Sequence, residues 1–147
     1  MLASGVIERG HVVRGTTRDP AQVPAIERAG VEPVVADPDV VATVVPAFDH
    51  VTVVCILLGS ATGPPDQLAA LHGSRLEMLL TKLIDTTARG LVYEAVGTVD
   101  PALLAGGVEQ VRRFGGRSVA EVAVLDADPA DAPGWLEAAL AAVERGL

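Results

Sequence analysis

The chain of 147 residues carries a formal net charge of −8 and is 50% hydrophobic, but only 3% aromatic. A net negative charge repels the phosphates of DNA and RNA, so nucleic acid is excluded as an expected partner. The length fits one domain over residues 1–147. Its aliphatic composition is typical of buried parallel strands covered by helices.

The first half of the chain alternates short helical and β-branched segments. Glycines follow two of the helical segments, at Gly10 and Gly30, where a helix C-terminus favours a residue that tolerates positive φ. The expected elements are a helix over 2–9, a strand over 11–17, a turn and helix over 18–30, a strand over 31–38 and a short helix over 39–48.

The second half continues the alternation with longer elements. Residues 50–59 are continuously hydrophobic, which predicts a strand buried on both faces. Strict alternation with short loops indicates an α/β fold, a parallel sheet with helices on both faces. The other expected elements are a long helix over 66–86, a strand over 90–97, a helix over 100–115, a strand over 119–128 and a helix over 131–147.

The single cysteine, Cys55, cannot form an internal disulfide, and no apolar stretch approaches the roughly 18 residues of a membrane span. We therefore expect a cytoplasmic protein without a membrane partner. The histidines, His11, His50 and His72, are too scattered for metal-ligand spacing, and His72 is expected to be a partly buried, hydrogen-bonded side chain. Asp126, Asp128 and Asp131 are attributed to turns and helix caps, so no metal site is predicted.

The run "ERGHVVRGTTRDPAQVPAIERAGVEPVVADPDV" (8–40) resembles the second through third strands of an NAD(P)-binding Rossmann domain. It is most similar to the extended and atypical, NmrA-like, short-chain dehydrogenase/reductases. "VVCILLGSATG" (53–63) and "LVYEAVGTV" (91–99) are similar to the family's fourth and fifth strands. The resemblance covers about residues 1–100 and implies a three-layer Rossmann-like sheet that binds a dinucleotide.

The resemblance also implies that the family's first strand and its Gly-rich pyrophosphate turn are not in this sequence. Strand order 3-2-1-4-5-6 would then leave the strands at 11–17 and 50–59 with unpaired edges facing each other. Three explanations are open. The start codon was assigned too late, which we favour; the gene is a degraded remnant; or these two strands pair directly.

The resemblance assigns Thr17 and Arg18 to the adenosine ribose, where an arginine pairs with the 2′-phosphate and favours NADP(H) over NAD(H). Arg14 is a weaker candidate for the same role. Asp37 matches the family's acidic position near the adenine amino group. A solvated turn arginine at 18 and a plain turn aspartate at 37 are the alternatives.

Leu57, Leu58 and Gly59 end the fourth strand, where the family's backbone approaches the cofactor and glycine permits close contact. The alternative at Gly59 is a strand-ending glycine. The cofactor-binding prediction therefore comprises Thr17, Arg18, Asp37, Leu57, Leu58 and Gly59.

The reductase catalytic set of the family is not matched. Ala95 and Val96 occupy the serine positions, and no tyrosine follows Tyr93 and no lysine follows Lys82. A binding or regulatory role is therefore predicted, with no catalytic residue assigned. Two alternatives are an NAD(P)-dependent oxidoreductase or epimerase that uses other groups such as Thr98, and a module that dimerises through sheet edges without a cofactor.

Overall fold

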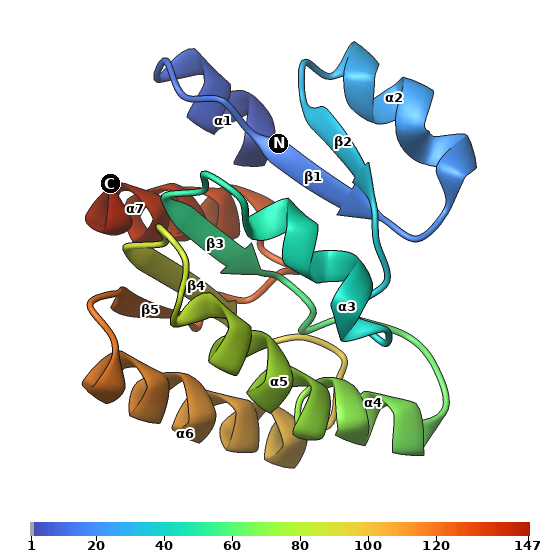
Figure 1. The fold of residues 1–147 in the computed structure, drawn as a ribbon, viewed down its shortest axis with the longest axis vertical. Coiled ribbons are helices and arrows are strands. Elements are labelled where there is room, and N and C mark those ends of the chain that lie inside the picture. Colours follow the sequence, from blue (N-terminus) through green and yellow to red (C-terminus); the bar gives the residue numbers. More distant parts are fainter. Residues whose placement is uncertain (1) are drawn as a thin grey trace.

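The computed structural model describes residues 2–147 and has the predicted α/β fold, with parallel strands and helices on both sides (Figure 1). The strands form two sheets. In the first, β1 (Arg14–Thr17) pairs with β2 (Glu32–Val35). In the second, β4 (Gly90–Glu94) lies between β3 (Val53–Ile56) and β5 (Glu121–Leu125).

The helices form two layers around the strands. The layer of α1, α2 and α7 packs against one face, and the layer of α3, α5 and α6 packs against the other. The helical elements are α1 (Leu2–Glu8), η1 (Pro20–Gln22), α2 (Val23–Arg28), α3 (Val41–Val44), η2 (Val45–Phe48), α4 (Pro65–Leu71), α5 (Ser74–Leu83), α6 (Pro101–Arg117) and α7 (Ala132–Gly146).

The core lies mainly on the two faces of the three-stranded sheet. Leu91 and Tyr93 of β4 point into the cluster under α5 and α6, whereas Val92 points into the cluster under α7. All five residues of β4 are buried, as a central parallel strand requires. The three-layer arrangement predicted from the sequence is therefore confirmed.

The expectation that residues 50–59 are buried on both faces is wrong at Cys55, whose side chain is exposed. Val54 and Ile56 point into the core below α5, and Val53 and Leu57 pack toward α7. β3 is the edge strand of its sheet, and the helices that pack on the sheet do not fully cover the Cys55 side chain. The surrounding protein still disfavours the thiolate by desolvation and raises the pKa of Cys55 to about 11.

The single helix expected over 66–86 is also wrong, because it is divided into α4 and α5 at His72 and Gly73. The Gln110 side-chain amide donates to the carbonyl oxygens of both residues, at 3.2 and 3.0 Å. A Cβ at Gly73 would collide with the carbonyl oxygen of Ala69. The break is therefore held by α6 and requires glycine.

Three aspartates cap helical elements, and the cap expected at Asp131 is confirmed. Asp100 accepts a hydrogen bond from Ala102 N–H at the start of α6, with Pro101 at the first helical position. Asp19 and Asp131 serve η1 and α7 in the same way.

β1 and β3 belong to different sheets, so the alternative in which these two strands pair directly is wrong. The sheets are connected instead by Arg14, whose guanidinium donates to the carbonyl oxygens of Ala47 and Asp49 at 3.0 and 2.7 Å. Its Nε lies 3.3 Å from a Glu32 carboxylate oxygen but makes no hydrogen bond. Among residues 2–147, none of the helices combines the length and apolar character needed to cross a membrane.

Candidate functional site

A small pocket of about 180 Å³ opens where β1, β2 and β3 end. The carboxyl ends of parallel strands are the usual ligand-binding edge of α/β proteins. The lining comes from three loops and α4: Thr16, Thr17, Arg18, Ala36, Pro38, Asp39, Leu58, Ala61, Thr62, Gln67, Leu68 and Leu71. We call this the strand-end pocket.

Three of the residues predicted to bind cofactor meet in the strand-end pocket. Thr17 and Arg18 reach it from β1, and Leu58 reaches it from the loop after β3, although the two strands are not paired. Leu57 instead packs into the cluster under α7, on the other face of the sheet. The topology therefore brings together residues that are 40 positions apart, from Arg18 to Leu58.

Arg18 faces a carboxylate and a second guanidinium that the sequence analysis did not identify. Its Nη1 lies 3.6 Å from Asp39 Oδ2, and Arg75 Nη1 of α5 lies 2.9 Å from Asp39 Oδ1. The Arg18 side chain is 61% exposed, whereas that of Asp39 is 17% exposed. Two guanidinium groups share one carboxylate, so neither is fully neutralised by it.

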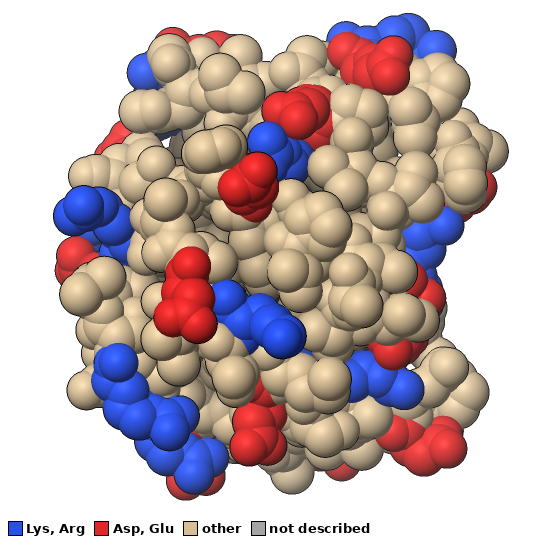
Figure 2. Space-filling view, viewed as in Figure 1, with Lys and Arg blue, Asp and Glu red and all other residues tan. Residues whose placement is uncertain are grey.

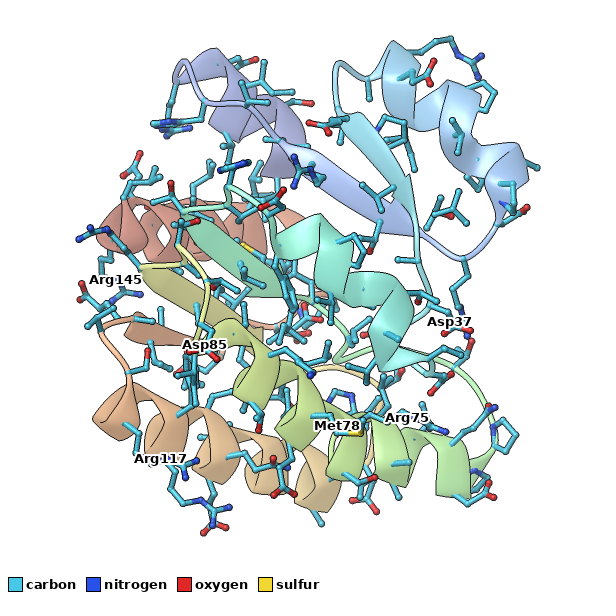
Figure 3. All side chains as sticks on the ribbon, in the orientation of Figure 1. Asp37, Arg75, Met78, Asp85, Arg117 and Arg145 are labelled. Carbon is cyan, nitrogen blue, oxygen red and sulfur yellow. The ribbon has the colours of Figure 1, made fainter. Side chains whose placement is uncertain are left out.

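Asp37 lies beside the strand-end pocket and shapes the loop that carries Asp39. Its Oδ1 accepts a hydrogen bond from Asp39 N–H at 2.9 Å, and its own N–H donates to Thr43 Oγ1 at 2.8 Å. Figure 3 labels Asp37 on the connection after β2 and Arg75 on α5. The Asp37 carboxylate therefore makes the contact of a turn aspartate, while its neighbours Pro38 and Asp39 line the pocket.

Gly59 is buried and enclosed by the protein's own groups. A Cβ there would lie 2.7 Å from the carbonyl oxygen of Val96 and 3.0 Å from the Glu94 carboxylate. Its N–H donates to Glu94 Oε1 at 2.9 Å. A Cβ at Gly97 would in turn collide with the carbonyl oxygen of Gly59. These close contacts within the protein explain why position 59 is a glycine, and none of them involves a ligand.

His72 joins the loop after β3 to the core. Its Nε2 lies 3.0 Å from the carbonyl oxygen of Leu58, which can only accept, so Nε2 carries the proton. Nδ1 then accepts the hydroxyl proton of Tyr93, at 2.6 Å. His72 and Tyr93 are 3% and 0% exposed. Burial lowers the pKa of His72 despite the nearby Glu94 carboxylate, and burial raises the pKa of Tyr93.

Glu94 is a third residue that the sequence analysis missed, after Asp39 and Arg75. It is 5% exposed and accepts from Gly59 N–H and from Trp135 Nε1, the latter at 2.8 Å. A carboxylate inside a fully buried strand needs hydrogen-bond donors, and this is the signal by which the sequence could have indicated it. Glu94 therefore fixes the loop after β3 to α7.

This arrangement favours binding over acid–base chemistry. Tyr93 and His72 have the right groups for proton transfer, but both are buried and hydrogen-bonded within the protein. Thr98 is exposed and its N–H donates to Ser60 Oγ at 3.4 Å. Within residues 2–147, no three His, Cys, Asp or Glu side chains cluster in a way that could hold a metal ion.

A larger hollow of about 670 Å³ lies between α5 and α6, away from the predicted cofactor residues. Both helices line it, with Glu77, Leu80, Leu103 and Arg113 among its residues. Figure 2 shows acidic and basic side chains intermixed on this face of the molecule, with no large patch of one sign.

Comparison with known proteins gives no family assignment, since no protein-family model matches the sequence and no curated protein matches it significantly.

Proposed function

We propose that the chain is an NAD(P)-binding Rossmann-like protein that prefers NADP(H) and has a binding or regulatory role in the cytoplasm. One observation carries the proposal. Thr17 and Arg18 of β1 and Leu58 after β3 line one pocket at the carboxyl ends of the strands, with Arg75 beside it. Guanidinium groups are well suited to a phosphate on a ribose.

The size of the strand-end pocket defines which part of the cofactor it would take. Its volume of about 180 Å³ is well below the roughly 300 Å³ at which sites for whole small ligands begin. We therefore assign to it the ribose and 2′-phosphate of NADP(H). Arg18 and Arg75 would hold the phosphate, and Thr17 lines the pocket beside Arg18.

A binding role is preferred to turnover because the nearby groups best suited to proton transfer are engaged within the protein. The buried Tyr93 and His72 are occupied by each other, and Ala95 and Val96 stand where the resembling family has hydroxyls. The bound cofactor would supply a hydride donor or acceptor, but the residues around the pocket serve to hold and orient it.

The direct test is a titration with NADPH and with NADH, followed by cofactor fluorescence, for the wild-type chain and for Arg18→Glu. A charge-assisted phosphate contact contributes about 1.5 to 3 kcal/mol, which corresponds to roughly ten- to hundredfold in affinity. NADPH affinity should fall by about this factor in Arg18→Glu, and NADH affinity should change little. Adenosine 2′-monophosphate should compete with NADPH better than adenosine 5′-monophosphate does.

Arg28→Glu is the matched control, because Arg28 is an exposed arginine of α2 and the charge change is the same. It should leave both affinities unchanged. Equal losses for NADPH and NADH in Arg18→Glu, or equal losses in both variants, would contradict the assignment of Arg18 to the 2′-phosphate.

A further inference from the structure

Residues 60–70, which lie between β3 and α5 and include most of α4, form an exposed segment beside the strand-end pocket. None of these residues is buried, whereas Gly59 before them and Leu71 and His72 after them are buried. A segment with few buried contacts opens at a lower free energy than the domain as a whole. We call residues 60–70 the cover segment.

The cover segment forms one wall of the strand-end pocket. Leu58 and Leu71 line the pocket from the two ends of the segment. The opposite wall belongs to the loops after β1 and β2. Opening of the segment therefore removes one wall of the pocket and leaves the other in place. The residues of the segment that line the pocket are Ala61, Thr62, Gln67 and Leu68.

His72 ties both ends of the cover segment to the core. Its Nε2–H donates to the carbonyl oxygen of Leu58, which also accepts from Ala61 N–H at 3.2 Å. Its Nδ1 accepts from the hydroxyl of Tyr93, in the central strand β4. One imidazole ring therefore connects the start of the segment, the end of the segment and the middle of the sheet.

Only the neutral ring satisfies this arrangement. An imidazolium carries a hydrogen on Nδ1 as well, so the Tyr93 hydroxyl would have to turn its own hydrogen elsewhere. Among residues 2–147 this buried hydroxyl has no hydrogen-bond partner other than His72. It also packs against Gly107, where a Cβ would collide with it. Protonation therefore leaves a buried donor unpaired and a charge out of water, and both costs are relieved when the ring leaves its site.

The charged groups around the ring do not compensate for this cost. Glu94 of β4 favours the protonated ring, but burial outweighs its effect. Asp66, the charged residue of α4, is exposed. α5 and α6 contribute two acidic and two basic side chains to the hollow that His72 borders, so their charges balance. These four residues are Glu77, Glu109, Arg113 and Arg117.

We propose that His72 is a pH-sensitive switch, which holds the cover segment closed over the strand-end pocket while its ring is neutral and releases it when the ring is protonated. His72 does not line the pocket, so its role is to position Leu58 and the segment. The switch does not depend on the identity of the ligand. Only its effect on NADP(H) rests on the proposed function.

Proton linkage gives the expected size of the effect. In the opened segment the pKa of His72 is close to its ordinary value of 6.5, whereas burial lowers the pKa in the closed form. The closed form is therefore favoured above pH 6.5 and loses this advantage as the pH falls below it. Between pH 7.5 and pH 5.5 the opening equilibrium should rise by up to about tenfold.

The test is residue-resolved hydrogen exchange of the full chain at these two pH values, corrected for the intrinsic exchange rate at each. The amides of Ala61 and Leu68 report on the segment, because each donates to a carbonyl oxygen that precedes it by a few residues. Their opening should rise by up to about tenfold at pH 5.5. Val92 of β4 should keep its protection, because the sheet stays folded.

His72→Gln keeps a donor and an acceptor but does not titrate, so the rise at Ala61 and Leu68 should disappear in this variant. His11→Gln, at an exposed histidine, is the matched control and should keep the rise. If His72→Gln fails to fold, the ring nitrogen NMR signals of His72 in the wild-type chain decide. They should show the Nε2–H tautomer at pH 7.5 and the imidazolium only in the opened form.

An equal rise at Val92 would overturn the proposal in favour of unfolding of the whole domain. A rise that persists in His72→Gln would overturn it in favour of another titrating group, and an imidazolium signal from the closed form would do so as well. At pH 7.5 NADPH should slow exchange at Ala61 and Leu68, and bound NADPH without slowing would overturn the link between segment and pocket. Absence of NADPH binding would count against the proposed function alone, and the comparison of the two pH values would still decide the switch.

Discussion

The two sheets differ sharply in how completely they are buried. In the three-stranded sheet every residue of β4 is buried, and α5 and α6 each contribute four buried residues to the core. In the two-stranded sheet no residue of β1 or β2 is buried, and α1 and α2 contribute none. Two-stranded units are marginal on their own, so the part around β1 and β2 depends on contacts with the rest of the molecule.

The largest expected effect comes from the same substitution made in each sheet. Val92→Ala in β4 removes two methyl groups at a position only 2% exposed, which should cost about 2 to 3 kcal/mol of unfolding free energy. Val34→Ala in β2 is half-buried and should cost below about 1 kcal/mol. Urea denaturation measures both. Equal costs would mean that the two sheets are equally well packed.

Removal of the connection between the sheets should have the next largest effect. Arg14→Met keeps the aliphatic stem but loses the hydrogen bonds to Ala47 and Asp49, and should destabilise the chain by about 1 to 2 kcal/mol. In the variant, hydrogen exchange should accelerate more at the amides of β1 than at the amides of β4. Arg9→Met, which removes an exposed ion pair with Glu144, is the control and should cost about 0 to 1 kcal/mol. A uniform loss of protection would contradict the connecting role of Arg14.

The pH dependence of stability should come from the part of the molecule around the three-stranded sheet, which is the more completely buried of the two. Burial lowers the pKa of His72 in the folded chain below its ordinary value of 6.5, so the unfolded chain binds more protons in that range. The stability that the neutral, buried His72 contributes is therefore fully present above pH 6.5. It is lost as the pH falls below 6.5. Burial outweighs the two effects that raise the pKa of His72, which are the hydrogen bond to the Leu58 carbonyl and the charge of Glu94.

His72→Gln should reduce the drop in melting temperature between pH 7.5 and pH 5.5, whereas His11→Gln, at an exposed position, should not. The measurement is thermal unfolding of the three proteins at the two pH values. An unchanged drop in His72→Gln would show that His72 does not titrate in the folded chain as its burial implies.

The smallest effect is expected at the strand-end pocket. Asp39→Asn removes the carboxylate that Arg18 and Arg75 share, which should raise NADPH affinity up to about fivefold, because Arg18 is largely exposed and a surface ion pair is worth only about 0 to 1 kcal/mol. NADH affinity should not change. Fluorescence titration measures both, and a loss of NADPH affinity would mean that Asp39 supports the site.

The sequence predicted the order and type of the elements because local patterns determine them. The alternation of strands and helices and the cap at Asp131 rest on periodicity and short-range hydrogen bonds. The break at Gly73 was not predictable in this way, since Gln110 of α6 holds it. The exposure of Cys55 depends on which strand lies beside β3, which the pattern within residues 50–59 does not specify.

The same distinction applies to the candidate site. The positions of Thr17, Arg18 and Leu58 follow from the rule that parallel strands end at one edge. Arg75 and Asp39 meet only through the packing of α5 against the loop after β2, and no spacing in the sequence indicates that contact. Residues placed by topology were predictable, whereas those placed by helix packing were not.

Residue-resolved hydrogen exchange of the unliganded full chain tests the central claim, that β1 and β3 have unpaired edges facing each other. The account predicts slow exchange for Val92 in β4 and fast exchange for the amides of Thr16 and Cys55. Slow exchange at both Thr16 and Cys55 in the isolated chain would contradict it, because it would mean that the two strands pair with each other.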